Sequence, residues 1–190
     1  MSRAQRLCES VHVASLGIWL GALGMSIASA AIVFPTIKSL GPHLDEFSRY
    51  SGPHSLIAGG QVANRVFLVG DIVQFVCVLA AGLTFGIAVM WLGLSMRRVS
   101  TFLRATLLLG LVGILAYRFG VVQPRWDEDL RQHWEAARAG DNDAAARSKA
   151  SLDALHPVQT RLMGVTGAMV GAALALAVAA APGPRIGEGE

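Results

Sequence analysis

Four long stretches of this 190-residue chain contain almost no charged side chains, and this pattern restricts the fold more than any other feature. They comprise residues 10–37, 66–96, 105–124 and 162–184. Asp71 and Arg118 are the only Asp, Glu, Lys or Arg residues inside them. A helix needs about 20 mostly apolar residues to cross a bilayer, and each stretch is long enough. The sequence therefore predicts a polytopic membrane protein and excludes soluble enzyme folds.

The composition agrees with a membrane location. Apolar residues make up 53% of the chain and charged residues only 15%, against about 25% in soluble domains. The net charge of +3 comes without a basic stripe interleaved with aromatic residues, so we expect no nucleic-acid partner. The two cysteines, Cys8 and Cys77, lack CxxC spacing and are interpreted as small apolar fillers.

We predict an all-α transmembrane four-helix bundle that forms a single membrane domain over residues 1–190. Pro35 is expected to end the first span, and Pro124 and Pro157 to mark kinks or helix starts. The polar residues 124–156 are expected to form a helical hairpin that extends spans three and four beyond the membrane. The spans lie at about 11–34, 62–94, 101–122 and 159–181.

Small residues recur three and four positions apart in the first and fourth spans. Gly17, Gly21, Gly24 and Ala28 follow this spacing in span one. The same spacing recurs in span four, at Gly164, Gly167, Ala168, Gly171 and Ala175. Small residues let helix backbones approach closely. We interpret both sets as packing inside the bundle, in preference to a dimerisation motif.

The basic residues indicate an orientation. Arg3 and Arg6 precede span one, and Arg97, Arg98 and Arg104 are assigned to the short loop between spans two and three. Because basic residues favour the cytoplasmic side, we expect cytoplasmic termini and an outward-facing hairpin. The apolar run continues past a signal-peptidase-like site at 28–30, so we interpret the first segment as a retained span.

Polar residues inside the second span form a line. Asn64, Asp71 and Gln74 fall within an arc of roughly 80° on a helix, so we expect them to face the bundle interior as a candidate binding site. Arg118 lies at a matching depth in the third span, which runs antiparallel to the second. We predict a salt bridge between Asp71 and Arg118, because a lone charge in a low-dielectric site is costly. Fixing the helix register is the favoured role of this pair, and a proton or ligand pathway is the alternative.

The hairpin and the histidines offer other candidate sites. Trp126 and Trp134 recur at helical spacing and are candidate anchors for a partner protein, although packing within the hairpin or at the membrane interface is the favoured reading. A bundle that binds haem b needs two histidines facing each other at one depth. His54 and His156 come nearest to that arrangement, but neither lies deep in a span, so we predict no cofactor and no metal.

The order of these motifs resembles a known family. His12, Trp19 and Gly21 give H-x6-W-x-G, followed by Phe34-Pro35 and by Asp71 and Gln74, with Pro124-Arg125 and Leu155-His156 later in the chain. Over residues 10–181 this pattern is similar to the transmembrane protein 205-like family, also called domain of unknown function 4149. The resemblance implies a four-span integral membrane protein without an established activity. Distantly similar copper-resistance proteins keep a metal function open, but the long Gly/Pro-containing first loop and the lack of Met-rich or Cys-rich motifs weaken it.

No assembled nucleophile, phosphate loop or zinc motif occurs in the sequence, which favours a non-enzymatic protein. We therefore expect a small accessory or structural component of the bacterial inner membrane, with a membrane-protein partner or a second copy of the chain. The alternative is a small transport or metal-handling protein that uses the Asp71/Arg118 cluster. A haem-b electron carrier is a third, weaker hypothesis.

Overall fold

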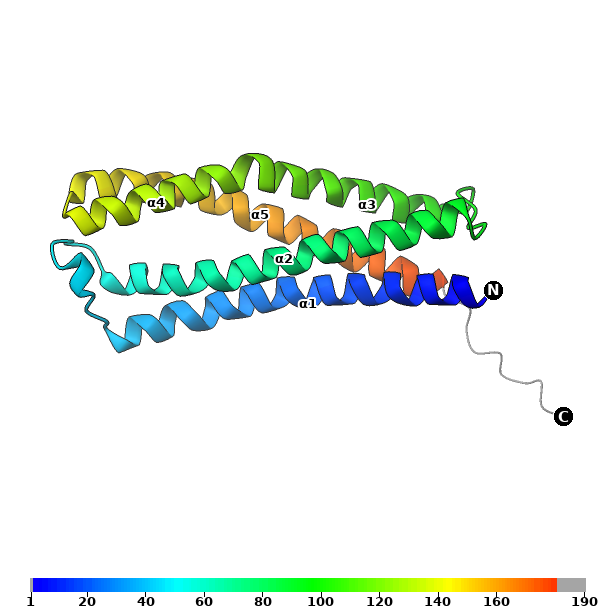
Figure 1. The fold of residues 1–190 in the computed structure, drawn as a ribbon, viewed down its shortest axis with the longest axis horizontal. Helices are drawn as coiled ribbons and strands as arrows, with labels where there is room; N and C mark the ends of the chain where they lie inside the picture. The colour runs from blue at the N-terminus through cyan, green and yellow to red at the C-terminus, as the bar shows by residue number, and fades with distance from the viewer. Residues whose placement is uncertain (1, 181–190) are drawn as a thin grey trace.

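A computed structural model describes residues 2–180, which form helices joined by short loops and contain no strand (Figure 1). The helices are α1 (Arg3–Leu40), α2 (His54–Met90), α3 (Val99–Tyr117), α4 (Gln123–Ala139) and α5 (Asn142–Ala180). A short 3₁₀ turn, η1 (Asp45–Phe47), lies in the loop between α1 and α2. A π-helical turn, η2 (Arg118–Val122), joins α3 to α4.

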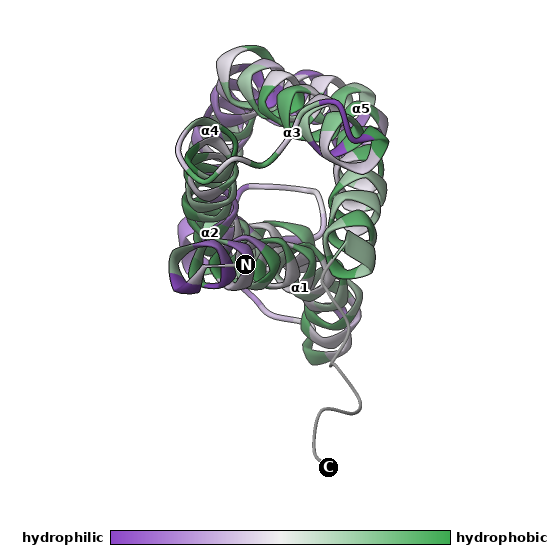
Figure 2. Cartoon of the chain, turned by 90° about the vertical axis from the view of Figure 1, so that its right-hand side faces the viewer, coloured by the Kyte–Doolittle hydropathy of each residue, from purple (hydrophilic) through white to green (hydrophobic). Residues whose placement is uncertain are grey.

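Four helical rods run side by side along the long axis of the molecule (Figures 1 and 2). Because η2 continues α3 into α4, residues 99–139 form one rod, and each of the four rods is long and apolar enough to cross a membrane. Helix α1 packs along α2, while α5 packs against α1, α3 and α4. The predicted all-α four-helix bundle is thereby confirmed.

The apolar side chains divide between a packed interior and the outer surface. Leu16, Trp19, Ala81 and Leu111 belong to the main core and are completely buried. Many large apolar side chains instead point outward, and Leu109 is 74% exposed. Soluble monomers rarely expose such a continuous apolar surface, whereas lipid tails cover it at no cost. The arrangement supports an integral membrane protein.

The helices are longer than the sequence predicted. Helix α1 continues through Pro35 to Leu40, so the prediction that Pro35 ends the span is wrong, and α5 likewise contains Pro157. Helix α2 begins at His54 instead of near 62 and ends at Met90 instead of near 94. Proline removes one backbone donor, but neighbouring helices in a bundle can compensate for that loss. At 38 and 37 residues, α1 and α2 extend past a bilayer core of about 30 Å, as the hairpin does.

The small residues do not lie where the sequence analysis placed them. Gly17, Gly21 and Gly24 are exposed on α1, and a Cβ added at each of them meets no atom within 4 Å. In α5, Gly164, Ala168 and Ala175 are also exposed, while Gly167 and Gly171 are partly buried. The buried face of α5 is instead formed by Thr166, Val170, Ala173 and Ala177. The prediction that these stripes pack inside the bundle is wrong for their exposed residues, because the opposite faces of α1 and α5 make the interior contacts.

The first loop and the tip of the α4–α5 hairpin form one unit at the same end of the molecule (Figure 1). Phe47 and Ile57 pack against Ala137 and Ala145 in a second, separate core. Asn142, at the start of α5, accepts hydrogen bonds from the Ser51 amide and hydroxyl at 2.8 and 3.0 Å. We call this unit, residues 41–57 with 130–152, the platform.

Candidate functional site

Asp71 and Arg118 form an ion pair inside the bundle. Asp71 Oδ1 lies 2.7 Å from Arg118 Nη2, and the two side chains are 14% and 7% exposed. Asp71 comes from the middle of α2 and Arg118 from the first position of η2. The predicted salt bridge is confirmed.

Arg118 lies on the regular buried face of α3 and is the first residue of the π-helical turn η2. A π turn inserts an additional residue and so rotates the side chains that follow it, and such turns are frequent at functional sites. Leu108, Leu111 and Leu115 form the buried face of α3, and Arg118 continues this face at the next turn. Its guanidinium also lies over the Phe119 ring, 5.0 Å from the ring centroid. No local pattern predicts this turn, because Gly120 is flanked only by ordinary apolar side chains and by Arg118.

The ion pair connects inward to α1 through Gln74. The Gln74 amide donates a hydrogen bond to Asp71 Oδ1 at 3.0 Å and accepts one from Trp19 Nε1 at 3.3 Å. Gln74 is 2% exposed and Trp19 is completely buried. Asp71 and Gln74 therefore face the bundle interior as predicted and contact each other, and Trp19 completes the polar path at the centre of the core.

The ion pair also connects outward to α5 and α4. Arg118 Nε donates to Gln159 Oε1 at 3.4 Å, and Gln159 Nε2 donates to Gln123 Oε1 at 3.3 Å. Gln123 Nε2 then donates to Asp127 Oδ1 at 2.8 Å. We call the whole series the polar chain; it consists of Trp19, Gln74, Asp71, Arg118, Gln159, Gln123 and Asp127. It ties all four rods together.

Asn64 takes no part in the polar chain. It lies almost two turns before Asp71 on α2 and is partly buried, but none of the side-chain hydrogen bonds within residues 2–180 involves it. The structure therefore brings together three of the four predicted binding residues, and a ligand-binding role for any of them stays a prediction.

A second buried ion pair lies near the end of the bundle where α1 and α3 begin. Glu9 Oε1 of α1 lies 2.9 Å from Arg104 Nη2 of α3, and the side chains are 18% and 3% exposed. The assignment of Arg104 to the loop is wrong, because α3 begins at Val99 and Arg104 is within its second turn. Glu9 and Arg104 each stand next to a charge-free stretch, so matching their depths in the two spans could have predicted this pair.

His12 lies one turn from Glu9 and belongs to the same cluster. Its ring is 1% exposed, and its Nδ1 lies 3.0 Å from the carbonyl oxygen of Ala81 on α2. Phe85 lies beside it, with ring centroids 5.8 Å apart. The sequence analysis placed His12 at the end of a span but did not predict its burial.

The other histidines belong to the platform or its edge. His43 and His54 stack with ring centroids 5.1 Å apart, and His54 Nδ1 accepts a hydrogen bond from the Leu44 amide at 3.0 Å. His133 bonds the carbonyl oxygen of Ala145 at 2.9 Å and thereby joins α4 to α5. His156 instead lies against Trp126. Across residues 2–180, no group of three or more His, Cys, Asp or Glu side chains is placed to hold a metal ion.

The two hairpin tryptophans are partly buried. Trp134 packs against the Phe47 core of the platform, and the Trp126 ring centroid lies 6.3 Å from that of His156. Both contacts are internal to the chain; that of Trp126 lies within the hairpin, and that of Trp134 also involves the first loop. Their use as partner anchors stays a prediction.

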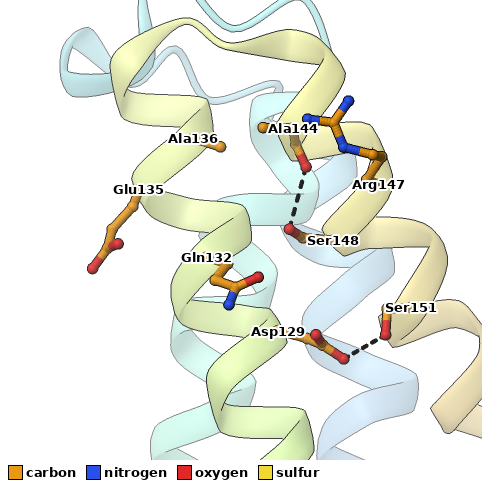
Figure 3. A pocket seen from close by; sticks show the side chains of 8 residues that line it. All are labelled: Asp129, Gln132, Glu135, Ala136, Ala144, Arg147, Ser148 and Ser151. Carbon is orange, nitrogen blue, oxygen red and sulfur yellow. Dashed lines mark hydrogen bonds between the residues drawn. The ribbon is translucent and has the colours of Figure 1, made fainter.

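An open hollow of about 460 Å³ lies between α4 and α5 on the platform (Figure 3). Asp129 and Gln132 of α4 face Ser148 and Ser151 of α5 across it, and Ser151 Oγ donates to Asp129 Oδ2 at 2.6 Å. Its lining consists of Asp129, Gln132, Glu135, Ala136, Ala144, Arg147, Ser148 and Ser151. The lining of the hollow combines acidic, basic, hydroxyl and alanine side chains.

Comparisons with known proteins add no relative. No protein-family model, curated protein or solved structure matches this chain.

Proposed function

We propose that this chain is a non-enzymatic accessory component of a membrane, which presents the platform to a membrane-protein partner. The observation that carries the proposal is the docking of the first loop onto the hairpin through Phe47, Ile57, Ala137 and Ala145. Segments about 90 residues apart are thereby held as one ordered surface outside the apolar part of the rods. A loop that served only to connect two spans would need no such core.

The polar chain supports this proposal. Its two buried charges, Asp71 and Arg118, pair with each other and are neutralised within the bundle. A pair of this kind specifies which helices meet and at what register. The hairpin, which begins five residues after Arg118 with Gln123, then has a defined position on the bundle.

Location, orientation and family are part of the same proposal. The chain would lie in a bacterial inner membrane with both termini in the cytoplasm and the platform outside. Membership of the transmembrane protein 205-like family is consistent with this role, since that resemblance implies no activity. Ala146→Cys on the platform and Met96→Cys on the opposite loop, in a Cys8→Ser and Cys77→Ala background, are expected to be labelled from the outer and the inner side, respectively.

Photo-crosslinking tests the accessory role. A crosslinker amino acid at Gln132, inside the hollow, is expected to join the chain in membranes to one partner of defined mass. The same crosslinker at Met96, at the other end of the bundle, serves as the matched control and is expected to give no such product. Reversing charge at Glu135 and Arg147 should remove the product. Equal products from both positions, or none from either, would contradict the proposal.

The runner-up is a small transport or metal-handling protein, and one observation favours it. The polar chain leads from the buried Trp19 to Asp127 on the hairpin, where Asp127 is exposed. Intramembrane charges often mark ion pathways. In proteoliposomes, a proton or metal-ion flux that Asp71→Asn abolishes would establish this reading in place of the accessory role. A haem-b carrier would instead reveal itself by a haem absorbance band in the purified protein.

A further inference from the structure

The cluster around Arg104 lies apart from the polar chain and has no role in the proposed function. It is found at the end of the bundle that contains the N-terminus and the α2–α3 turn (Figure 1). Glu9 and His12 come from α1, Phe85 from α2 and Arg104 from α3. Both His12 and Arg104 are at least 98% buried, with exposed fractions of 1% and 2%.

The hydrogen bond between His12 and Ala81 determines which ring nitrogen of His12 is free to accept a second hydrogen bond. Its Nδ1 lies 3.0 Å from the Ala81 carbonyl oxygen, and a carbonyl oxygen can only accept, so Nδ1 carries the hydrogen. A second positive charge beside the buried Arg104 guanidinium is unfavourable, so the ring is neutral. Nε2 of His12 therefore presents a bare lone pair to the cluster.

Several polar atoms of this cluster have unused hydrogen-bonding capacity. Within residues 2–180, His12 Nε2 and Arg104 Nε have no hydrogen-bond partner. Arg104 Nη2 and Glu9 Oε1 lie 2.9 Å apart as an ion pair, but their alignment does not make a hydrogen bond. Leaving a buried donor or acceptor unpaired costs about 1–3 kcal/mol. The acceptor His12 Nε2 and the donor Arg104 Nε would therefore both be stabilised by a group that completes their hydrogen bonds.

We propose that Glu9, His12 and Arg104 form a binding site for one uncharged hydroxyl group. The hydroxyl donates its hydrogen to His12 Nε2, and its oxygen accepts from Arg104 Nε, so that one group satisfies both atoms. The charges of Glu9 and Arg104 cancel, so an anion would bring an uncompensated charge into a buried site.

The same chemistry has two sources, which are a water molecule and the phenolic head of a lipid-soluble quinol. Phe85 favours neither, but its ring gives the site an aromatic wall: the ring centroid lies 5.8 Å from that of His12 and 5.4 Å from Arg104 Cζ. Glu9 is the most exposed of the three polar side chains.

Nitrogen NMR of the full-length protein in micelles, labelled with ¹⁵N-histidine, tests the proposal without a substitution. The His12 Nε2 resonance, assigned as the signal that His12→Phe removes, is expected at the upfield-shifted position of a nitrogen that accepts a hydrogen bond. A resonance at the position of a free lone pair would overturn the proposal. Magnetisation transfer from water to His12 identifies water as the source.

Quinol binding distinguishes the second source. A short-chain quinol is expected to bind at least tenfold more tightly than its dimethyl ether, which keeps the shape but lacks both hydroxyl hydrogens; tenfold corresponds to about 1.4 kcal/mol. His12→Phe should remove this preference, and His156→Phe, outside the cluster, should keep it. If neither water transfer nor a quinol preference is observed, the hydroxyl site does not exist.

Discussion

Asp71 and Arg118 neutralise each other across the bundle, with Oδ1 and Nη2 2.7 Å apart. Each is the only acidic or basic residue of its charge-poor stretch. Their pairing links α2 to η2, the segment from which the hairpin continues. The remainder of the polar chain extends this link to α1 through Gln74 and Trp19 and to α5 through Gln159.

Removing the charge of Asp71 is expected to destabilise the bundle strongly. Asp71→Asn leaves the buried Arg118 charge uncompensated, at a cost of about 3–5 kcal/mol in the free energy of unfolding. The matched control is Arg65→Gln on the same helix, where the side chain is exposed, and a change within about 0.5 kcal/mol is expected there. Denaturant unfolding in mixed micelles measures both; equal effects would contradict the pairing argument.

Trp19→Phe tests the inner end of the polar chain. The substitution removes the indole donor to Gln74 and leaves its buried Oε1 unpaired, so we expect a loss of about 1–3 kcal/mol. Trp91→Phe is the control, since Trp91 is 74% exposed and should tolerate the change. A Trp19 variant as stable as the Trp91 variant would show that the hydrogen bond contributes nothing.

Gly140→Ala is expected to loosen the platform. Gly140 ends α4 with a φ of 77°, and an added Cβ would lie 2.7 Å from Cβ of Arg49 in the first loop. Gly41 also has a positive φ, 56°, but a Cβ there meets no atom within 4 Å. Gly140→Ala and Gly41→Ala should each be destabilised by about 1–2 kcal/mol of backbone strain. Only Gly140→Ala should also displace the first loop. Faster amide exchange in residues 44–51 of that variant alone is the expected result.

Asn142→Ala should separate the first loop from the hairpin without unfolding either. The Asn142 side chain accepts from Ser51 and donates to the Arg49 carbonyl oxygen at 3.3 Å. Without it, the Ser51 amide loses its acceptor, and its hydrogen exchange should accelerate about tenfold, which corresponds to about 1.4 kcal/mol. Asn64→Ala is the control variant and should leave the hydrogen exchange of the Ser51 amide unchanged. Unaltered protection in the Asn142 variant would mean that the platform is held by its apolar core alone.

The spans and the Asp71–Arg118 pair could be predicted from the sequence for a common reason. Charges are so costly in lipid that stretches with almost no charge mark the rods. The two charged residues inside these stretches, Asp71 and Arg118, therefore had to pair with each other. Helix ends were less predictable. Pro35 and Pro157 are strong local signals for a helix boundary, yet the long neighbouring helices override both.

Other features depend on which way each helix faces, and the sequence leaves that open. The Gly17, Gly21 and Gly24 stripe and the Leu16, Trp19 and Leu23 stripe have the same helical spacing, and only packing decides which of the two is buried. The pairing of Arg104 with Glu9 was missed because Arg104 was counted with the basic residues of the loop, although it lies inside the predicted third span and inside α3. The contact of the first loop with the hairpin is a long-range one, for which no local pattern exists.

A double-mutant cycle on Asp71 and Arg118 tests most directly whether this pair fixes the bundle. Unfolding free energies are measured for Asp71→Asn, Arg118→Gln and the double variant. Because the double variant leaves no uncompensated charge, we predict that it is more stable than Asp71→Asn alone and that the coupling exceeds about 1 kcal/mol. Additive losses, with the double variant the least stable of the three, would contradict the account.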